Sequence, residues 1–196
     1  MQTQTRYYAP EEYLELEEQA EYRSEYRDGE IIAMTGGTTN HNKIALNFAA
    51  SLKYGLRKKN YDVYISDVRL WILRYRQHTY PDVMIIQGEP IYATENNTTV
   101  MNPLLIAEVS SKSTSNYDQS DKFMYYRSIP EFKEYILINQ YQYHVMQYVK
   151  TNDSKWIFTE LESESDILTL QTIDFQIALS EIYEQVNFTQ SNENQE

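Results

Sequence analysis

Two acidic residues set in short apolar runs constrain this chain more than any other sequence feature. Asp82 opens the apolar run at residues 83–86, and Glu108 lies late in the run at residues 104–109. Runs of this length, rich in β-branched residues, are typical of strands that are buried on both faces of a sheet. An ionised carboxylate in such a strand costs several kcal/mol to desolvate unless a positive charge compensates it.

A bound cation would account for both acids, because hard divalent ions such as Mg²⁺ take carboxylate oxygens as ligands. The sequence therefore predicts a metal-dependent, nuclease-like site built on Asp82 and Glu108. The alternative is structural: Asp82 caps a turn after Pro81, and Glu108 pairs with an arginine.

The length and composition bound the class of protein. A chain of 196 residues can bury a substantial core, and we expect one domain over residues 1–187 with a disordered polar tail at 188–196. The absence of cysteine excludes disulfides and thiolate metal sites. No apolar run has the length of a membrane span, and the first residues lack the apolar segment of a signal peptide, which favours the cytoplasm and no membrane partner.

The charge is unevenly distributed. The net charge of −12 argues against non-specific affinity for a polyanion. Residues 43–80, however, carry 8 basic against 2 acidic side chains, and this segment directly precedes Asp82. It would suit a phosphate backbone, although solvated helix and strand surfaces are the commoner explanation for such a segment.

Helices and strands interleave at first, and strands cluster later, which predicts an α/β fold with a central mixed sheet flanked by helices and additional C-terminal strands. The expected helices are residues 10–21, 41–56, 118–128 (stopped by Pro130) and 179–186. The expected strands are residues 30–34, 63–73 (one strand or two), the two acid-bearing runs, 134–138, 143–148, 156–159, 168–170 and 173–175. Strand 63–73 is expected to lie antiparallel to the Asp82 strand.

A lysine is missing from the place where nucleases usually have it. Their usual arrangement pairs a glutamate with a lysine two residues on, so that both side chains face one reacting phosphate. Here that position holds Ser110. Lys112, next again on the same face, and Lys122, on the following helix, are the two candidates to supply the charge.

Several short motifs, in a consistent order, carry a family resemblance. They are Tyr8-Ala9-Pro10-Glu11-Glu12-Tyr13-Leu14, residues 25–31, His41, Pro81-Asp82-Val83, residues 108–114, Tyr117-Asp118 with Lys122 and Tyr126, and Ile129-Pro130-Glu131-Phe132. Together, over about residues 7–187, they resemble the bacterial Uma-two family, which is classed with restriction endonucleases in the PD-(D/E)XK nuclease superfamily.

The resemblance implies a restriction-endonuclease-like fold and metal-dependent cleavage of nucleic acid, with Asp82 and Glu108 as metal ligands. It favours Lys122 over Lys112, because the family's lysine lies on the helix after the Tyr-Asp pair, whereas the position of Lys112 is commonly proline. Glu25 matches an early family glutamate, which is expected to reach the site from the first helical region, and His41 matches a recurrent histidine at the start of the next helix.

The chemistry of these residues suggests a role for each. Asp82, Glu108 and the main-chain carbonyl of Val109 would hold one Mg²⁺ or Mn²⁺ ion. Lys122 would orient the attacking water or stabilise developing charge. Glu25 would complete a second metal position or hold a ligand water.

The accessory residues also have structural, non-catalytic interpretations. Glu25 also fits a solvated helix-end acid, and His41 fits a helix cap or a packed histidine. Asp67 either faces the site or sits in a turn. Lys112 remains an alternative to Lys122.

Three functions follow from this reading. The first is an endonuclease that hydrolyses DNA. The second is a catalytically silent protein of the same fold that binds a partner or itself, which the acidic charge and the missing strand lysine favour. The third acts on RNA or a nucleotide. A homodimer is an expectation from the tyrosine-rich and apolar late strands.

Overall fold

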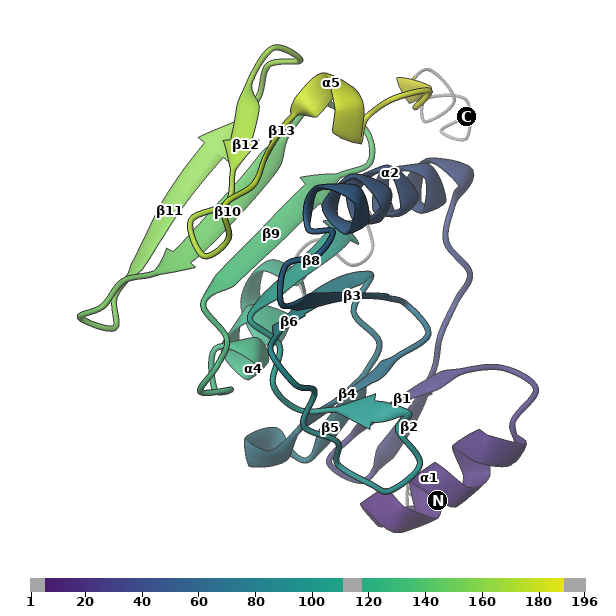
Figure 1. Ribbon diagram of the computed structural model, residues 1–196. Coiled ribbons are helices and arrows are strands. Elements are labelled where there is room, and N and C mark those ends of the chain that lie inside the picture. Colours follow the sequence, from purple (N-terminus) through teal and green to yellow (C-terminus); the bar gives the residue numbers. More distant parts are fainter. Residues whose placement is uncertain (1–5, 111–117, 189–196) are drawn as a thin grey trace.

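The computed structural model describes residues 6–110 and 118–188, arranged as a mixed α/β fold (Figure 1). Lys112 and residues 189–196 of the predicted tail lie outside the described residues. The helices are α1 (Pro10–Gln19), α2 (Thr39–Gly55), α4 (Phe123–Tyr126) and α5 (Leu179–Ile182), with a 3-10 turn η1 (Leu73–Tyr75) and a π-helical turn η2 (Asp118–Lys122). The strands are β1 (Ser24–Arg27), β2 (Glu30–Ala33), β3 (Tyr61–Ile65), β4 (Arg69–Ile72), β5 (Gln77–Thr79), β6 (Val83–Gln87), β7 (Thr99–Val100), β8 (Leu105–Ser110), β9 (Glu134–Asn139), β10 (Val145–Lys150), β11 (Trp156–Leu161), β12 (Ile167–Thr169) and β13 (Gln176–Ala178).

The larger sheet has the strand order β11-β10-β9-β8-β6-β3. Strands β8 and β9 run parallel, and the other neighbours are antiparallel, so the sheet is mixed, as predicted. The two acid-bearing runs form adjacent central strands, β6 and β8. Their apolar residues are buried on both faces, which confirms the interpretation of these runs.

Alternation along β6 and β8 assigns each residue to one face of this sheet. Val83 and Ile85 belong to a core cluster that includes residues of α2, whereas Met84 and Ile86 belong to a second cluster that includes Tyr126 of α4. Asp82 has the same parity as Met84, and Glu108 has the same parity as Ile106 of the second cluster. The strand period therefore places both carboxylates on the α4 side of the sheet.

Helix α2 spans one face of the large sheet (Figure 1). The Thr38 side chain caps its first turn by accepting a hydrogen bond from the main-chain N–H of His41 at 3.1 Å. Ile44, Phe48 and Leu52 recur at helical spacing and are fully buried, which confirms the predicted apolar stripe. No helix in residues 6–110 or 118–188 is long and apolar enough to cross a membrane.

A second sheet, of order β2-β1-β5-β4-β7, packs with α1 at the other end of the molecule (Figure 1). Asp28 and Gly29 join β1 to β2 with positive φ angles of 37° and 104°, as tight hairpins favour. Glu25 therefore lies on a strand, and the prediction that placed it in the first helical region is wrong. Strand β1 has no apolar run, and it is formed because β2 and β5 pair with it on both sides.

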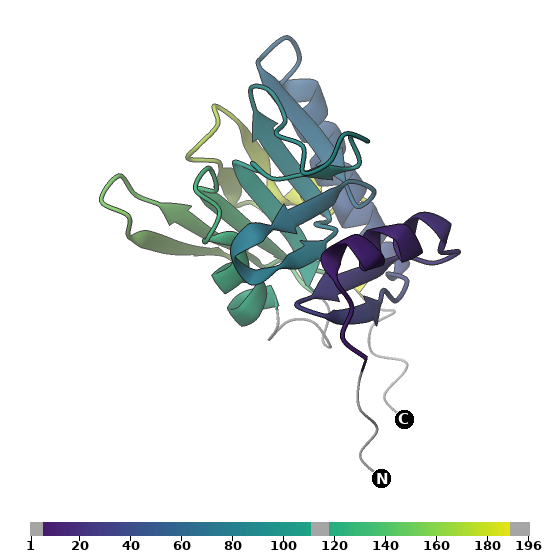
Figure 2. The ribbon, with the colours of Figure 1, turned by 90° about the horizontal axis from the view of Figure 1, so that it is seen from below.

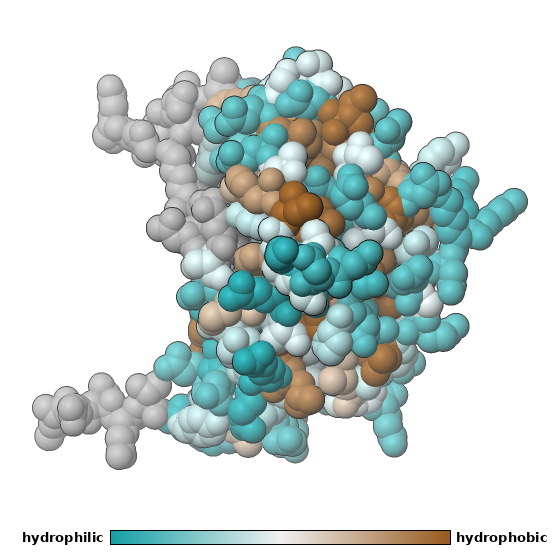
Figure 3. Space-filling model, turned by 90° about the vertical axis from the view of Figure 1, so that its left-hand side faces the viewer, coloured by the Kyte–Doolittle hydropathy of each residue, from teal (hydrophilic) through white to brown (hydrophobic). Residues whose placement is uncertain are grey.

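The C-terminal part adds a β10–β11 hairpin that projects from the body (Figure 2), followed by β12, β13 and α5. Several predicted bounds shift. Among them, the strand expected at 173–175 lies at 176–178, the last helix ends at Ile182, and the helix expected at 118–128 begins as a π-helical turn and ends at Tyr126. β11 is an edge strand with exposed Ile157 and Phe158. Figure 3, viewed from this side, shows hydrophobic residues among hydrophilic ones.

His78 makes the small sheet sensitive to acid. It is 2% exposed, its ring stacks on Trp71 and Tyr13, and its Nδ1 has no hydrogen-bond partner in the described structure. Burial first, and the Arg69 charge second, lower the pKa of His78 to about 3. The unfolded chain takes up this proton below its ordinary value of about 6.5, whereas the folded chain does not, so stability falls as the pH falls below about 6.5.

We expect the free energy of unfolding to drop by about 2 kcal/mol between pH 7 and pH 5 through this residue. Urea unfolding at the two pH values measures the loss. His78→Phe, which keeps a stacked ring without a proton site, should remove most of the difference. An equal pH dependence in both proteins would contradict the role of His78.

Candidate active site

Asp82 and Glu108 face each other across β6 and β8. The register pairs Val83 with Ala107, so Asp82, one residue before β6, lies opposite Glu108. The main-chain N–H of Asp82 donates to Glu108 Oε2 at 3.4 Å, and the N–H of Val109 donates to Asp82 Oδ2 at 2.8 Å. Directly opposed residues of antiparallel strands project to the same face. The two carboxylates, 26 positions apart in the chain, therefore converge.

Lys122 and Tyr126 both bind Glu108. The Lys122 ammonium lies 3.0 Å from Glu108 Oε1, and the Tyr126 hydroxyl donates to the same oxygen at 2.6 Å. Their spacing of four residues puts both side chains on one face of the segment formed by η2 and α4. Glu108 is only 3% exposed, so the lysine compensates a carboxylate that water does not reach.

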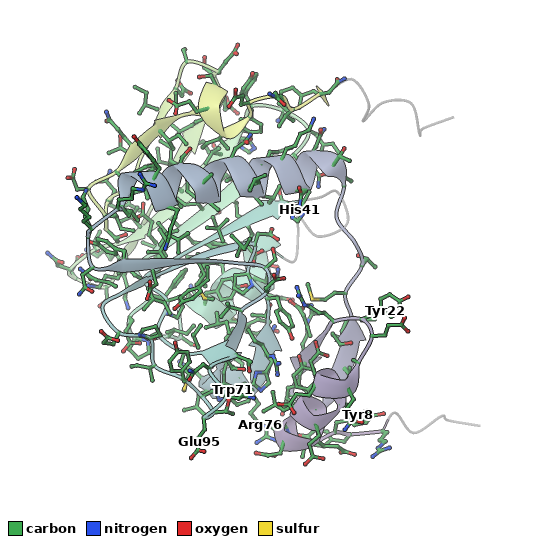
Figure 4. The ribbon with its side chains drawn as sticks, turned by 45° about the vertical axis from the view of Figure 1, so that its right-hand side comes forward. Tyr8, Tyr22, His41, Trp71, Arg76 and Glu95 are labelled. Atoms are coloured by element: carbon green, nitrogen blue, oxygen red, sulfur yellow. The ribbon has the colours of Figure 1, made fainter. Side chains whose placement is uncertain are left out.

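His41 contacts Asp82 from the first turn of α2, at the end of the helix marked in Figure 4. Its Nε2 lies 2.9 Å from Asp82 Oδ2. An ionised carboxylate only accepts hydrogen bonds, so the imidazole donates through Nε2. Both hydrogen bonds of the Asp82 side chain fall on Oδ2, and no hydrogen bond from the described residues reaches Oδ1, which leaves that oxygen available to a ligand.

Glu25 reaches the same region from β1. Thr79 Oγ1 donates to its Oε1, and Arg27 Nη2 donates to its Oε2 at 2.9 Å. Burial by itself raises the pKa of Glu25, but the Lys122 ammonium and the hydrogen bonds from Thr79 and Arg27 outweigh burial and hold that pKa below its usual range. Glu25 is therefore buried and ionised, and the interpretation as a solvated helix-end acid does not hold.

Of the remaining predicted residues, Asp67 does not reach the site and Lys112 is not described. Asp67 lies in the turn between β3 and β4, where its exposed carboxylate pairs with Arg23 at 2.5 Å and does not contact Asp82 or Glu108. Lys112 lies outside the described residues, so its position relative to Glu108 stays a prediction. The structural alternative, in which Glu108 pairs with an arginine, is replaced by a pair with Lys122.

A divalent ion is compatible with the donors at this site. In the part of the chain that the structure describes, no group of three or more acidic or histidine side chains could hold a metal on its own. An ion here would depend on the carboxylates of Asp82 and Glu108, a main-chain oxygen and water. Mg²⁺ retains several waters and needs only one or two carboxylates, so this donor set fits it.

Sequence reasoning named Tyr126 as part of a motif but gave it no role at the site, and it missed Thr79 and Arg27. Tyr126 positions Glu108, whereas Thr79 and Arg27 hold Glu25. The i, i+4 spacing of Lys122 and Tyr126 is a signal that the sequence contains. Thr79 and Arg27 carry no such signal, because only the pairing of β1 with β5 brings them to Glu25.

A family model described as "Putative restriction endonuclease", Uma2, matches residues 10–180. The chain belongs to the Uma2 family. Two proteins from Synechocystis sp. are similar to it in sequence. Uncharacterized protein sll1609 is 43% identical over 154 residues, which cover 79% of this chain and 87% of that protein. Uncharacterized protein slr1290 is 31% identical over 180 residues, which cover 92% of this chain and 93% of that protein.

A solved structure has a fold similar to that of this chain. It is titled a "putative nuclease belonging to DUF820" from Anabaena variabilis ATCC 29413, with a TM-score of 0.72 and 15% identity, covering 90% of this chain and 97% of that one. This likeness confirms the predicted restriction-endonuclease-like α/β fold. The family description, together with this fold, points to the nuclease class.

Proposed function

We propose that this Uma2 protein is a metal-dependent endonuclease that hydrolyses phosphodiester bonds of DNA. The observation that carries the proposal is the convergence of Asp82 and Glu108 on one face of the sheet, with the Lys122 ammonium 3.0 Å from Glu108. Two carboxylates and one ammonium are what phosphodiester hydrolysis needs to hold a cation and to balance charge on the phosphate.

Asp82 and Glu108 would hold Mg²⁺ or Mn²⁺, with the Val109 carbonyl as a further donor. When bound, such an ion supplies an activated water and neutralises charge on the scissile phosphate. His41 fixes the Asp82 carboxylate through Oδ2, and this orients Oδ1 toward the ligand position. Tyr126 fixes Glu108 in the same way.

Lys122 is the ammonium group that contacts Glu108, at 3.0 Å. Its ammonium would orient the attacking water or stabilise the charge that develops on the phosphate oxygens. Glu25, kept ionised by Lys122, Thr79 and Arg27, would accept a hydrogen bond from a ligand water. In this arrangement Glu25 of β1, Glu108 of β8, Asp82 directly before β6 and Lys122 of η2 would act on one phosphate.

Cleavage of plasmid DNA with Mn²⁺, compared with cleavage in excess EDTA, tests the proposal. Wild-type protein should cleave only with the metal, and Asp82→Asn should lose at least about 100-fold in rate because it removes a ligand charge. Asp62→Asn, which changes an aspartate on neighbouring β3, is the matched control and should keep its activity. Equal activity in wild type and Asp82→Asn would identify a contaminant.

Thermal melting provides a readout that does not depend on activity. Mn²⁺ should raise the melting temperature of wild type, because a ligand that binds only the folded state stabilises it and because the ion relieves repulsion between the acids. Asp82→Asn should show a smaller rise. No metal-dependent shift in wild type would count against a metal site.

The second candidate is a catalytically silent protein of this fold that works by association. Two observations favour it: Lys122 already neutralises Glu108, and edge strand β11 exposes Ile157 and Phe158. Unpaired edge strands offer main-chain groups to another copy of the chain. A protein that sediments as a dimer, fails to cleave with either metal and shows no metal-dependent melting shift would establish this function over the first.

A further inference from the structure

A polar pocket of about 460 Å³ lies beside the candidate active site, and Arg27, Arg74, Arg76, Tyr75 and Tyr125 line it. We call it the arginine–tyrosine pocket. Two of its residues connect it to the acids already described. Arg27 donates to Glu25 at 2.9 Å, and Tyr125 directly precedes Tyr126, whose hydroxyl binds Glu108. A ligand that contacts Arg27 in this pocket would therefore adjoin Glu25 of the candidate active site.

The charge of this pocket is opposite to that of the chain. Three arginines line it against two acids, Asp28 and Glu30, in a protein whose net charge is −12. One of those acids is already paired, because Arg76 Nε lies 3.0 Å from Asp28 Oδ1. The same pair engages Arg76, and Arg27 is paired with Glu25. Arg74, which forms no ion pair with the described residues, is therefore the lining cation that remains for an anion such as a phosphodiester.

Its aromatic residues add a second kind of contact. The rings of Tyr75 and Tyr125 lie 4.8 Å apart at an angle of 57°, and the Arg74 guanidinium lies over the Tyr75 ring at 5.7 Å. Arginines interleaved with aromatic rings hold single-stranded nucleic acid elsewhere, where the arginines bind phosphates and the rings stack on bases. The pocket volume also falls in the range of small-ligand sites.

Two hydrogen-bonded turns bring the arginines of the arginine–tyrosine pocket close together. Turn η1 ends at Tyr75, and Arg76 follows with a positive φ of 49°, an uncommon conformation for this residue type. The main-chain N–H of Asp28 donates to the Arg76 carbonyl at 3.0 Å, which ties this turn to the β1–β2 hairpin. The two linked turns bring Arg74, Tyr75 and Arg76 to the same pocket as Arg27.

We propose that the arginine–tyrosine pocket binds the nucleotide next to the scissile phosphate, with its base unpaired and unstacked. The inference rests on the proposed nuclease function and adds the substrate class: a nucleic acid with a single-stranded nucleotide at the cleavage point. A base inside a duplex is stacked on both faces and must leave the helix to enter a pocket. The protein should therefore prefer single-stranded or distorted DNA to a regular duplex.

Fluorescence anisotropy in EDTA tests the inference without any cleavage. The probes are a fluorescein-labelled single-stranded oligothymidylate and a labelled blunt duplex of the same length, at low salt. Wild type should bind the single strand about tenfold more tightly. Arg74→Ala should weaken that binding about tenfold, since it removes an exposed cation from the pocket.

Arg57→Ala is the matched control. Arg57 also lies over a tyrosine ring, that of Tyr54 at 5.1 Å, but it follows the far end of α2, about 25 Å along the helix from His41. Figure 4 shows Arg76 near α1, well away from α2. Arg57→Ala should bind the single strand as wild type does, and unchanged melting temperatures should show that both variants are folded.

Three results would overturn the inference: equal affinity for single strand and duplex, equal weakening by Arg74→Ala and Arg57→Ala, or no binding of either probe. Failure of the proposed function gives a different result. In that case the single strand binds and Arg74→Ala weakens the binding, but wild type cleaves nothing when Mn²⁺ is added.

Discussion

Replacing Lys122 by methionine is expected to reduce DNA cleavage by about 1,000-fold, because it removes the cation that we propose to act on the scissile phosphate. The same change should lower the free energy of unfolding of the metal-free protein by about 3 kcal/mol. Glu108 is 3% exposed, and Lys122 is its ion-pair partner at 3.0 Å, so the variant leaves a buried carboxylate without its cation. Plasmid cleavage and urea unfolding in EDTA measure the two effects.

Metal should partly rescue the stability of Lys122→Met. The ammonium neutralises Glu108 and also acts on Glu25, so its removal increases the repulsion that Mn²⁺ relieves. The variant should therefore show a larger Mn²⁺-dependent rise in melting temperature than wild type. Lys133→Met, at an exposed position after the same helix, should change neither property. A folded Lys122→Met that keeps wild-type cleavage would leave Lys112 as the catalytic lysine.

Replacing Glu134 by alanine should lower the free energy of unfolding by about 4 kcal/mol, although this residue lies outside the site. Glu134 is fully buried at the start of β9. Its carboxylate accepts hydrogen bonds from Gln147 Nε2 at 2.6 Å, from the N–H of Gln171 at 3.1 Å and from the N–H of Thr172 at 3.0 Å. The alanine variant removes the shared acceptor of these donors, and of the three only Gln147 Nε2 keeps another acceptor among the described residues, the Thr169 carbonyl at 2.9 Å.

Thermal and urea unfolding both check this expectation. A loss of that size corresponds to a fall of roughly 10 °C in melting temperature for a chain of this length. Glu131→Ala, an exposed glutamate in the turn before β9, serves as the control and should stay within about 0.5 kcal/mol of wild type. A Glu134→Ala protein as stable as this control would show that the turn between β12 and β13 does not depend on the carboxylate.

These two variants separate two uses of buried acids in one fold. Glu134 is satisfied by hydrogen-bond donors alone, with no cation in salt-bridge distance among the described residues, and it serves a turn. Glu108 and Glu25 both interact with Lys122, and Asp82, opposite Glu108, has an oxygen (Oδ1) that no hydrogen bond from the described residues reaches. Burial of an acid therefore does not by itself indicate a site, and a charged partner beside the acid is the stronger indication.

Much of the fold could be predicted from local patterns. The apolar runs around Asp82 and Glu108 indicated two buried strands, and helical spacing indicated α2. Pro130 indicated that the helix carrying Lys122 stops at residue 128, but the helix ends at Tyr126. Strand alternation assigns Asp82 and Glu108 each to one face of its own strand, but only the pairing of the two strands puts them on the same face of the sheet. The bounds that shifted, at the last strand and helix, belong to short elements whose ends depend on neighbours such as the turn held by Glu134.

The sequence by itself determined which segments are buried strands, which two acids lie in them and which family the motifs resemble, because period and composition record local backbone geometry and burial. Only the tertiary structure decided that Lys122 pairs with Glu108 and that Arg27 lines the same pocket as Arg74. It also decided that Glu25 lies on a strand, where Thr79 donates a hydrogen bond to its carboxylate. Those contacts depend on the register between strands that are distant in the chain, and no local pattern encodes that register.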